Sequence, residues 1–424
     1  MTNNKLTKGA SGATEGSPLR NRVAVVVLFP LFGKYLQILL LSPAPKAHKY
    51  VLISVAQWFL TFILHNNKAL HWRQRLALTF LQAQRASFPA HILRWLLRGV
   101  SSGDAILQHC DKHNIAHRIV TIDDAMRASS GASRSARAPP ATLHLLTPPG
   151  PGQDENAPTL LYFHGGGFVN PLRGAAHMPF IMRCAASCRA KQVAILEYSL
   201  APEHPYPAQL IQCVAALRYL LQEMHMGLED IVLAGDSAGG QLVGALLAHL
   251  TQPSPYAVPV KVTGRFRAAL FVSPFVRLPT STDVGSYESN EGRDYLSRAQ
   301  VDGFNAAWKG NEDDIWANLS GVQISRKVWS KVFARNSQGL VRKALITVGT
   351  AEVFLDCCRR FAQEHAGAEI IRAGRDTDWK GFEGNDIVLA ECEGEVHVQV
   401  ALDSVVHYHN GAMERAIMSW LAIV

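Results

Sequence analysis

The sequence predicts an α/β fold in which helices flank a mostly parallel central sheet. Beyond Thr159, short apolar runs bounded by turn residues alternate with stretches of helical periodicity. The runs are apolar throughout, which is typical of strands that a parallel sheet buries on both faces. The chain has 424 residues, of which 48% are hydrophobic and 18% charged. It is long enough for one large α/β domain with an additional segment, or for two domains.

Strands and helices are expected to alternate in this region. The strands are predicted at Thr159–Phe163, Val193–Tyr198, Ile231–Ala234, Ala268–Val272, Ala344–Val348 and Ile387–Glu391. Helical periodicity between them indicates helices over Ala208–Met224 and Ala238–Leu250. Functional groups collect at the carboxyl ends of the strands in such sheets, so a site is expected at that edge.

Two segments precede the predicted α/β domain, which we assign to residues 105–424. Residues 1–22 are polar and rich in Gly, Ser, Thr and Asn, and this composition predicts a disordered leader. Residues 23–104 are expected to form a helical cap or a membrane-associated segment. Within them, apolar residues between Ala69 and Arg98 recur at helical spacing with basic residues among them, which predicts amphipathic helices.

The apolar run Val23–Leu41 is long enough to span a bilayer at about 1.5 Å per residue, but Lys34 lies near its middle, where a charge is costly. A second apolar run covers Val51–Leu64. Three interpretations stay open for residues 23–64: a membrane anchor, an interfacial hairpin, or helices that cover a hydrophobic active-site mouth. No small-residue cleavage site follows the first run, so we expect no cleaved signal peptide. The expected location is intracellular. Whether the protein associates with a membrane there, and with which face of it, stays open.

Residues 123–158 break the helical pattern with Ala, Ser, Arg, Pro and Gly, which predicts a loop. A short strand-like run, Ala141–Leu146, interrupts this loop.

Composition argues against two classes of function. The net charge is +8, but Lys and Arg are scattered and no basic run is interleaved with aromatic residues, so we expect no nucleic-acid partner. The seven cysteines are odd in number and lack paired CxxC spacing, so neither a disulfide framework nor a zinc site is indicated.

The segment Gly235–Gly239 reads Gly-Asp-Ser-Ala-Gly and places Ser237 between a buried-strand run and an apolar helix. A serine nucleophile needs such a strand-to-helix turn, because small neighbours relieve crowding and let the hydroxyl project into a cleft. The amino terminus of the next helix also stabilises negative charge there. The pattern alone is weak evidence, since an ordinary Gly-rich turn contains the same residues and about one chance match per seven chains of this length is expected.

A glycine triplet earlier in the chain strengthens the prediction for Ser237. His164–Phe168 reads His-Gly-Gly-Gly-Phe and directly follows a strand run. Glycines let the backbone approach a substrate oxygen, so that N–H groups point at a developing oxyanion. The expected donors are the amides of Gly166, Gly167 and Ala238.

Together with Tyr198–Pro207, these motifs resemble the hormone-sensitive-lipase-like branch of the α/β hydrolases. The three motifs have the order and spacing of that family, and the resemblance covers about residues 105–424. It implies the α/β-hydrolase fold and a serine carboxylesterase that needs no metal and no cofactor. The implied substrates are esters of a short acyl group with a lipophilic alcohol, as in fungal-type steryl acetyl hydrolases or secondary-metabolite esterases.

His397 is the predicted general base. In the chain order serine, acid, histidine the base comes last, and His397 follows the final strand candidate. Its surroundings are similar to the family's Gly-x-x-His-x-Phe, with Gln399 in place of the aromatic residue. His407 and His409 also lie near the carboxyl terminus and are expected at the surface.

Glu352 is the predicted acid, and Asp356 is the alternative. The family usually has an Asp three residues after the Gly that follows this strand, and a second Asp four residues later; here Glu352 and Asp356 occupy these places. A carboxylate orients the imidazole and stabilises the imidazolium, which Glu can do where the backbone accommodates its extra methylene. The chain from Glu352 to His397 is longer than in the family, so residues 373–385 are predicted to form an inserted loop.

Four other polar residues near the motifs are predicted to be structural. Asp236 neighbours the nucleophile but points elsewhere on a tight turn, and His164 is expected to shape the glycine loop through a hydrogen bond. Glu203 and His204 are expected to order their own loop.

Two further functions stay open beside hydrolysis. An enzyme of a biosynthetic pathway that transfers an acyl group, releases a product or cyclises it uses the same triad. A non-catalytic receptor on this fold is expected to have lost a triad residue, whereas all three positions here carry competent side chains.

Overall fold

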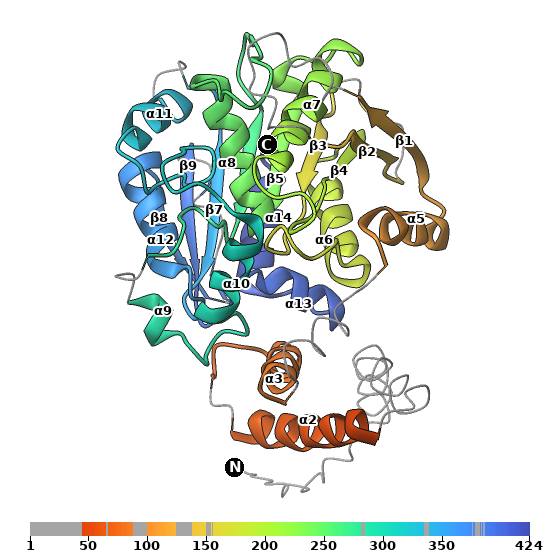
Figure 1. Ribbon diagram of the computed structural model, residues 1–424, viewed down its shortest axis with the longest axis vertical. Coiled ribbons are helices and arrows are strands. Elements are labelled where there is room, and N and C mark those ends of the chain that lie inside the picture. The colour runs from red at the N-terminus through yellow and green to blue at the C-terminus, as the bar shows by residue number, and fades with distance from the viewer. Residues whose placement is uncertain are drawn as a thin grey trace, which may run out of the picture. The chain divides into compact units, whose positions relative to one another are not determined.

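The computed structural model describes residues 45–64, 67–87, 100–123, 138–149, 154, 156–280, 285–334, 339–374, 376–377, 382, 384 and 386–424. Within these residues one nine-stranded sheet has the order β1-β2-β4-β3-β5-β6-β7-β9-β8 (Figure 1). The strands are β1 (Ala116–Ile122), β2 (Ala141–Thr147), β3 (Thr159–Phe163), β4 (Gln192–Glu197), β5 (Ile231–Asp236), β6 (Ala268–Val272), β7 (Ala344–Gly349), β8 (Glu369–Ala373) and β9 (Ile387–Cys392). Strand β2 pairs antiparallel with β1 and β4, and the remaining neighbours pair in parallel. Because all but two of these pairings are parallel, the prediction of a mostly parallel sheet flanked by helices is confirmed.

Every strand predicted from the sequence is present, with ends that differ by no more than two residues. The sequence analysis missed β1 and β8, which are the two edge strands. Side chains of β1 are exposed or half-buried along its whole length, and Ala373 is the buried residue of β8. Edge strands pack against little, so they lack the continuous apolar run that identifies a central strand. The loop predicted to start at residue 373 therefore begins one residue later, after β8.

Helices connect the strands and extend the domain. They are α2 (Pro45–Leu64), α3 (Trp72–Ser87), α5 (Ser102–His113), α6 (Gly174–Ser187), α7 (Ala208–Gln222), α8 (Ala238–Thr251), α9 (Ser286–Ser289), α10 (Arg298–Trp308), α11 (Ser325–Val332), α12 (Leu355–Arg360), α13 (Gln399–Val405) and α14 (Ala412–Leu421). Two short helical segments, η1 (Leu228–Asp230) and η2 (Phe361–Ala366), complete the described elements.

The two faces of the sheet bury different apolar clusters, because successive side chains of a strand point to opposite faces. In β3, Leu161 and Phe163 join the core that contains α7 and α8, while Leu160 and Tyr162 join the core that contains α6 and α14. All four side chains are fully buried. A sheet covered on both faces leaves its carboxyl edge as the place where loops can form a site.

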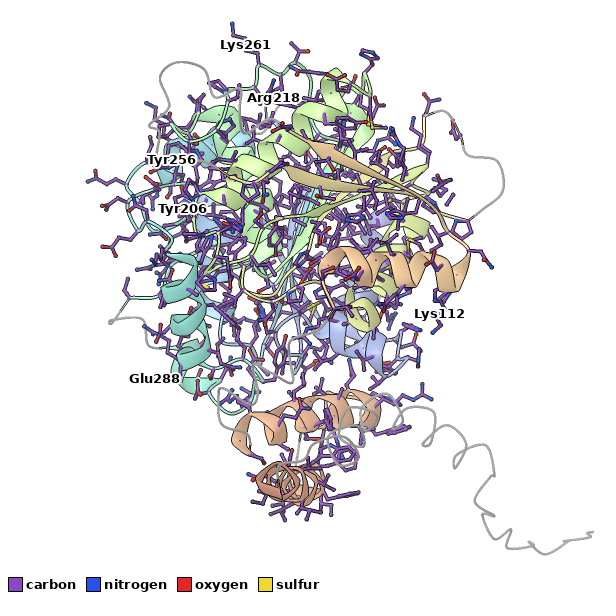
Figure 2. All side chains as sticks on the ribbon, turned by 45° about the vertical axis from the view of Figure 1, so that its right-hand side comes forward. Lys112, Tyr206, Arg218, Tyr256, Lys261 and Glu288 are labelled. Atoms are coloured by element: carbon purple, nitrogen blue, oxygen red, sulfur yellow. The ribbon has the colours of Figure 1, made fainter. Side chains whose placement is uncertain are left out.

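Outside the strands, side chains from two loops hydrogen-bond the same carboxylate. The hydroxyls of Tyr206 and Tyr256 both donate to Oδ2 of Asp314, over 3.2 and 2.9 Å. The ring centroids of these two tyrosines, which are labelled in Figure 2, lie 5.6 Å apart. One carboxylate thus connects two chain segments by hydrogen bonds to their side chains.

The chain divides into two units, Met1–Val51 and Leu52–Val424. Of the first unit only the opening turns of α2 are described. In the second unit, the Trp58 indole N–H donates to the carbonyl of Leu76 over 3.2 Å, and its ring meets Phe80 edge-on at 5.6 Å. These contacts join α2 to α3.

Helix α2 exposes large apolar side chains along one side, including Leu60, Ile63 and Leu64. Along the described chain, no helix combines the length and apolar character needed to cross a membrane. The predicted leader 1–22 and the apolar run 23–41 lie outside the described residues. Membrane association through residues 23–64 stays a prediction, as do the predicted segment boundaries after residues 22 and 104.

Candidate active site

Ser237 occupies the sharp turn between β5 and α8. Its φ of 52° and ψ of −115° are unusual for a residue with a side chain, and such conformations persist only where surrounding bonds hold them. The Ser237 N–H donates to the carbonyl of Val272 over 2.8 Å, and the Phe275 N–H donates to the Ser237 carbonyl over 3.0 Å. Both partners belong to β6 or the residues after it, so the neighbouring strand holds the turn.

The two glycines around Ser237 are required by close approach of the backbone. A Cβ on Gly239 would collide with the carbonyl oxygen of Phe163, and a Cβ on Gly235 would collide with Gly239 itself. The spacing of the pentapeptide therefore follows from packing of the turn against β3.

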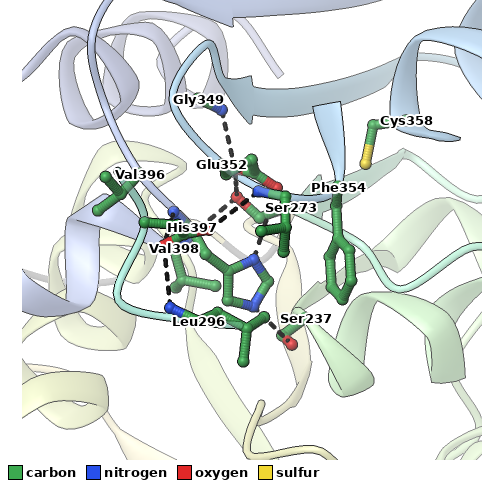
Figure 3. A network of polar contacts seen from close by, with 12 residues as sticks. Ser237, Ser273, Leu296, Gly349, Glu352, Phe354, Cys358, Val396, His397 and Val398 are labelled. Carbon is green, nitrogen blue, oxygen red and sulfur yellow. Dashed lines mark hydrogen bonds and ion pairs between the residues drawn. The ribbon is translucent and has the colours of Figure 1, made fainter. Parts of the chain in front are cut away.

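The structure brings His397 to Ser237. His397 follows β9, and its Nε2 lies 2.9 Å from the Ser237 Oγ (Figure 3). On the other side of the ring, Nδ1 lies 3.5 Å from Oε1 of Glu352, the residue three positions after the end of β7. Ser237, His397 and Glu352 thus come from the carboxyl ends of three parallel strands, as the sequence analysis expected for a site.

Glu352 is fully buried and held by two donors. Its Oε2 accepts hydrogen bonds from the Ser273 hydroxyl at 2.7 Å and from the Gly349 N–H at 2.9 Å (Figure 3). Oε1 is thereby left facing His397. Asp356, the alternative acid, instead accepts the Ser286 N–H at 2.8 Å, and its side chain is 49% exposed. The geometry therefore brings Glu352, rather than Asp356, to the imidazole.

The environment of His397 stabilises its protonated form. Burial lowers the pKa of His397, but the hydrogen bond and the negative charge of Glu352 outweigh this effect, so the pKa lies above its ordinary value of 6.5. The Phe354 ring packs edge-on against the imidazole, with centroids 4.9 Å apart. This aromatic contact limits the orientations that the ring can adopt.

The glycine loop after β3 offers backbone donors beside this pair. Gly166 has a φ of 120° and Gly167 a φ of 63°, a region that side chains strongly disfavour. Within the described residues, no hydrogen-bond acceptor is found for the amides of Gly166, Gly167 and Ala238. Free amides at a helix amino terminus and in a glycine turn are suited to bind an anionic oxygen.

Asp236 and His164 both hydrogen-bond Gly165 of the glycine loop. Asp236 accepts the Tyr162 hydroxyl at 2.6 Å and the Gly165 N–H at 3.0 Å. His164 bonds the Gly165 carbonyl through Nδ1 at 2.6 Å and is stacked on Tyr198. Burial lowers the pKa of His164 to about 4, so its imidazole is neutral at pH 7. Both side chains shape the loop.

The other residues named in the sequence analysis lie outside the group formed by Ser237, His397 and Glu352. Glu203 and His204 are exposed, and so are His407 and His409. Gln399 is fully buried, accepts the Val396 N–H at 3.3 Å and donates to Asp403 at 2.8 Å. Where the family has an aromatic residue, this chain supports the His397 loop by hydrogen bonds.

Sequence reasoning missed two buried residues that contact the site. Ser273 directly follows β6, so the rule that functional groups follow parallel strands was a signal for it. Asp294 lies between β6 and α10 with no motif around it, and its carboxylate accepts the N–H groups of Val353 and His397 at 3.0 and 3.4 Å. Burial raises the pKa of Asp294 to about 7.

Among the described residues, no group of three or more His, Cys, Asp and Glu side chains is arranged to hold a metal ion.

A parallel sheet with a strained serine after its central strand, a histidine and a carboxylate after later strands, and a glycine loop beside them define the α/β-hydrolase class. Residues 160–388, more than half of the chain, match the family described as alpha/beta hydrolase fold, and the chain belongs to this family. The resemblance to the hormone-sensitive-lipase-like esterases of this fold is confirmed.

The names of two curated relatives describe ester hydrolases. The protein called "Putative steryl acetyl hydrolase mug81" from Schizosaccharomyces pombe is 28% identical over 215 residues, which are 48% of this chain and 53% of that protein. Carboxylesterase NlhH from Mycobacterium tuberculosis is 39% identical over 102 residues, 23% of this chain and 31% of that enzyme. The chain thus spans about half of the first relative and a third of the second.

A solved structure of an esterase from the bacterial hormone-sensitive lipase family has a similar fold. It superimposes with a TM-score of 0.55, 21% sequence identity, and coverage of 84% of this chain and 98% of that one. At this identity the likeness concerns the fold.

Proposed function

We propose that this chain is a serine carboxylesterase with Ser237 as nucleophile, His397 as general base and Glu352 as the acid that orients the base. The observation that carries the proposal is the 2.9 Å contact between the Ser237 Oγ and Nε2 of His397 at a strained strand-to-helix turn. A nucleophile within hydrogen-bond reach of a base, which a third group orients, is the arrangement that acyl transfer requires.

The first half of the reaction acylates the serine. Nε2 of His397 takes the hydroxyl proton as the Ser237 Oγ attacks the ester carbonyl carbon. The carbonyl oxygen becomes an oxyanion, which the amides of Gly166, Gly167 and Ala238 stabilise; one such donor is worth about 2.7–4 kcal/mol of barrier. The bond to the alcohol then breaks, the alcohol leaves with the proton from Nε2, and the acyl group stays on Ser237.

The second half releases the acid. His397 removes a proton from water, the resulting hydroxide attacks the acyl carbon, and a second oxyanion forms in the same place. Its collapse breaks the bond to Ser237, which regains the proton from His397. Glu352 stabilises the imidazolium during both halves, as the raised pKa of His397 implies.

The proposed substrate is an ester of a short acyl group with a lipophilic alcohol. The name of the Schizosaccharomyces pombe relative, a steryl acetyl hydrolase, supports this class. Aromatic side chains near the reacting atoms suit an apolar ester: Phe354 packs on His397, and Phe304 packs directly against Gly167. A series of acetate, butyrate and octanoate esters measures the acyl length that the site accepts.

The test compares Ser237→Ala with Ser330→Ala, which changes an exposed serine of α11 outside the site. A fluorophosphonate probe is expected to label the unchanged protein and Ser330→Ala but not Ser237→Ala. Turnover of p-nitrophenyl acetate by Ser237→Ala is expected to fall by a factor on the order of 10⁶. Labelling that persists in folded Ser237→Ala contradicts the proposal.

Product analysis separates hydrolysis from acyl transfer, because both proceed through the same acyl-serine. Free carboxylic acid is expected as the main product from acetate, butyrate and octanoate esters, even with an added alcohol acceptor. A new ester in place of the acid would identify the chain as an acyltransferase.

A further inference from the structure

The chain between β6 and α10 carries a buried carboxylate that the proposed reaction does not use. Asp294 is fully buried, and among the described residues no Arg or Lys side chain bonds its carboxylate. A buried carboxylate is costly unless hydrogen bonds satisfy it. The groups that donate hydrogen bonds to the Asp294 carboxylate therefore indicate the role of this residue.

All three donors to Asp294 are backbone amides at or beside the site. Oδ2 accepts the N–H of Val353 at 3.0 Å, the residue that follows Glu352. Oδ1 accepts the N–H of Leu296 at 3.2 Å and the N–H of His397 at 3.4 Å. One carboxylate thus connects the loop that carries the acid to the loop that carries the base.

The segment around Asp294 is itself anchored to the acid loop. The Asn290 side chain donates to the Glu352 carbonyl at 2.8 Å, and the Asp294 N–H donates to the Asn290 carbonyl at 3.0 Å. Asn290 is also buried. Asn290 also donates to the Thr350 carbonyl at 3.3 Å. The acid loop therefore has contacts with this segment that do not pass through Asp294, while the His397 N–H contacts it through Asp294. Loss of the carboxylate is expected to loosen His397 more than Glu352.

We propose that Asp294 is a positioning residue, which holds the backbone of His397 and of the Glu352 loop at the separation that proton transfer from Ser237 needs. This proposal rests on the proposed function. Its physical reason is the 3.5 Å distance between Glu352 and the His397 ring, which is at the outer limit of a hydrogen bond. If His397 moves further from Glu352, that contact breaks. A misplacement of about 1 Å can cost about 100-fold in rate.

A purely structural role makes a different prediction. A carboxylate that only joins loops contributes to the stability of the fold, and its loss lowers the amount or the melting temperature of folded protein. A positioning residue lowers kcat per folded molecule and leaves KM nearly unchanged, because substrate binding does not need the Ser237–His397 geometry.

The experiment measures kcat, KM and melting temperature of Asp294→Asn with p-nitrophenyl acetate. Asn keeps the size of the side chain but replaces one acceptor oxygen by an NH₂ group that cannot accept an amide N–H. The expected result is a fall in kcat of about 10- to 100-fold with KM within about threefold. Asp294→Glu keeps the carboxylate but displaces it, and its kcat is expected to lie between those of Asp294→Asn and the unchanged protein.

Asp314→Asn is the matched control, because Asp314 also joins two segments with its carboxylate but does so through Tyr206 and Tyr256. It is expected to lower the melting temperature and to keep kcat. An unchanged kcat in Asp294→Asn overturns the proposal, and so does a loss of kcat that Asp314→Asn shares.

If Asp294→Asn does not fold, Asp294→Glu decides: a several-fold lower kcat at unchanged KM supports the proposal, and a kcat equal to that of the unchanged protein overturns it. Failure of the underlying function is seen separately, since Ser237→Ala would then keep its turnover and its labelling.

Discussion

At the scale of single residues, the site depends on atoms whose positions neighbouring strands determine. Ser237 keeps a strained backbone because Val272 and Phe275 hydrogen-bond it from both sides. Glu352 faces His397 because Ser273 and Gly349 occupy its second oxygen. Hydrogen bonds, several of them from neighbouring strands, thus stabilise the strained backbone of Ser237 and the buried carboxylate of Glu352. Such support is typical of preorganised sites.

Glu352→Gln tests the acid. The amide cannot stabilise the imidazolium, so kcat is expected to fall by about 10²- to 10⁴-fold. The carboxylate also raises the pKa of His397, so its removal is expected to move the acid limb of the kcat/KM profile to lower pH. The measurement is a pH–rate profile of the variant and the unchanged protein.

Asp356→Asn is the companion variant, because Asp356 is the alternative acid and bonds Ser286 instead. It is expected to keep both the rate and the acid limb. If only the Asp356 variant loses turnover, the assignment of Glu352 is wrong.

At the scale of elements, α3 contacts two segments that surround the site. Its Gln74 donates to Glu395 at 3.2 Å and to Asp403 at 2.9 Å, next to the His397 loop. Its Gln82 donates to the carbonyls of Gly292 and Arg293 at 2.9 and 3.0 Å, on the segment of Asp294. The helix therefore supports the base loop and the Asp294 segment together.

Gln74→Ala is expected to lower the free energy of unfolding by about 1–3 kcal/mol, because it leaves buried acceptors on Glu395 and Asp403 without this donor. Gln84→Ala, on the same helix but half-buried, is the control and is expected to change stability by about 0.5 kcal/mol or less. Urea unfolding measures both. Equal losses in the two variants would show that Gln74 has no special role.

At the scale of the whole molecule, several carboxyl groups are buried in the domain. Burial raises the pKa values of Asp294, Glu395 and Glu414 to about 7 each, above the ordinary values near 4. The folded protein therefore binds protons at neutral pH that the unfolded chain has released. In such a case stability falls as pH rises through the folded-state pKa.

Buried neutral histidines such as His164 have the opposite effect, since the lowered pKa makes the folded state bind fewer protons than the unfolded chain. Their contribution changes around pH 6.5, the ordinary histidine pKa, and therefore overlaps the range in which the carboxyls titrate. The effect of one carboxyl is seen by comparing the unchanged protein with a variant that lacks it.

The stabilisation from each carboxyl with a pKa near 7 is expected to fall between pH 6.5 and 8 by an amount on the order of 1 kcal/mol. Glu414→Gln removes one of these groups, so its free energy of unfolding is expected to fall less, or rise more, over this range than that of the unchanged protein. Denaturant unfolding of both proteins at several pH values checks this. Equal changes in the two proteins contradict the raised pKa of Glu414.

Most of the fold could be predicted from the sequence because central strands have a signal of their own. β3 and β6 have the predicted bounds, since each is an apolar run that both faces of the sheet bury. The edge strands β1 and β8 could not be found in this way, because pairing with a neighbour, rather than burial, makes them strands. Helix α9 has only four residues, which is too short to show a helical period, and tertiary contacts determine it.

Some residues of the candidate site could likewise be predicted from local motifs, while others depend on tertiary contacts. Ser237, the glycine loop, Glu352 and His397 were predicted because each lies in a local motif that directly follows a strand. The sequence favoured Glu352 through its position after Gly349 but kept Asp356 as the alternative, because the hydrogen-bond partners of two carboxyls four residues apart cannot be read from a local motif. Burial of Glu352 against Ser273, and the contact of Asp356 with Ser286, separate them.

The sequence by itself therefore determined the class of fold, the order of the central strands along the chain and the candidate nucleophile and base. These features are local, since they depend on apolar periodicity and on turns that only glycine permits. The tertiary structure decided how Ser273 holds Glu352 and how Asp294 joins the acid loop to the base loop. Those contacts join residues 79 and 103 positions apart, and no local pattern records which distant backbone a buried side chain will meet.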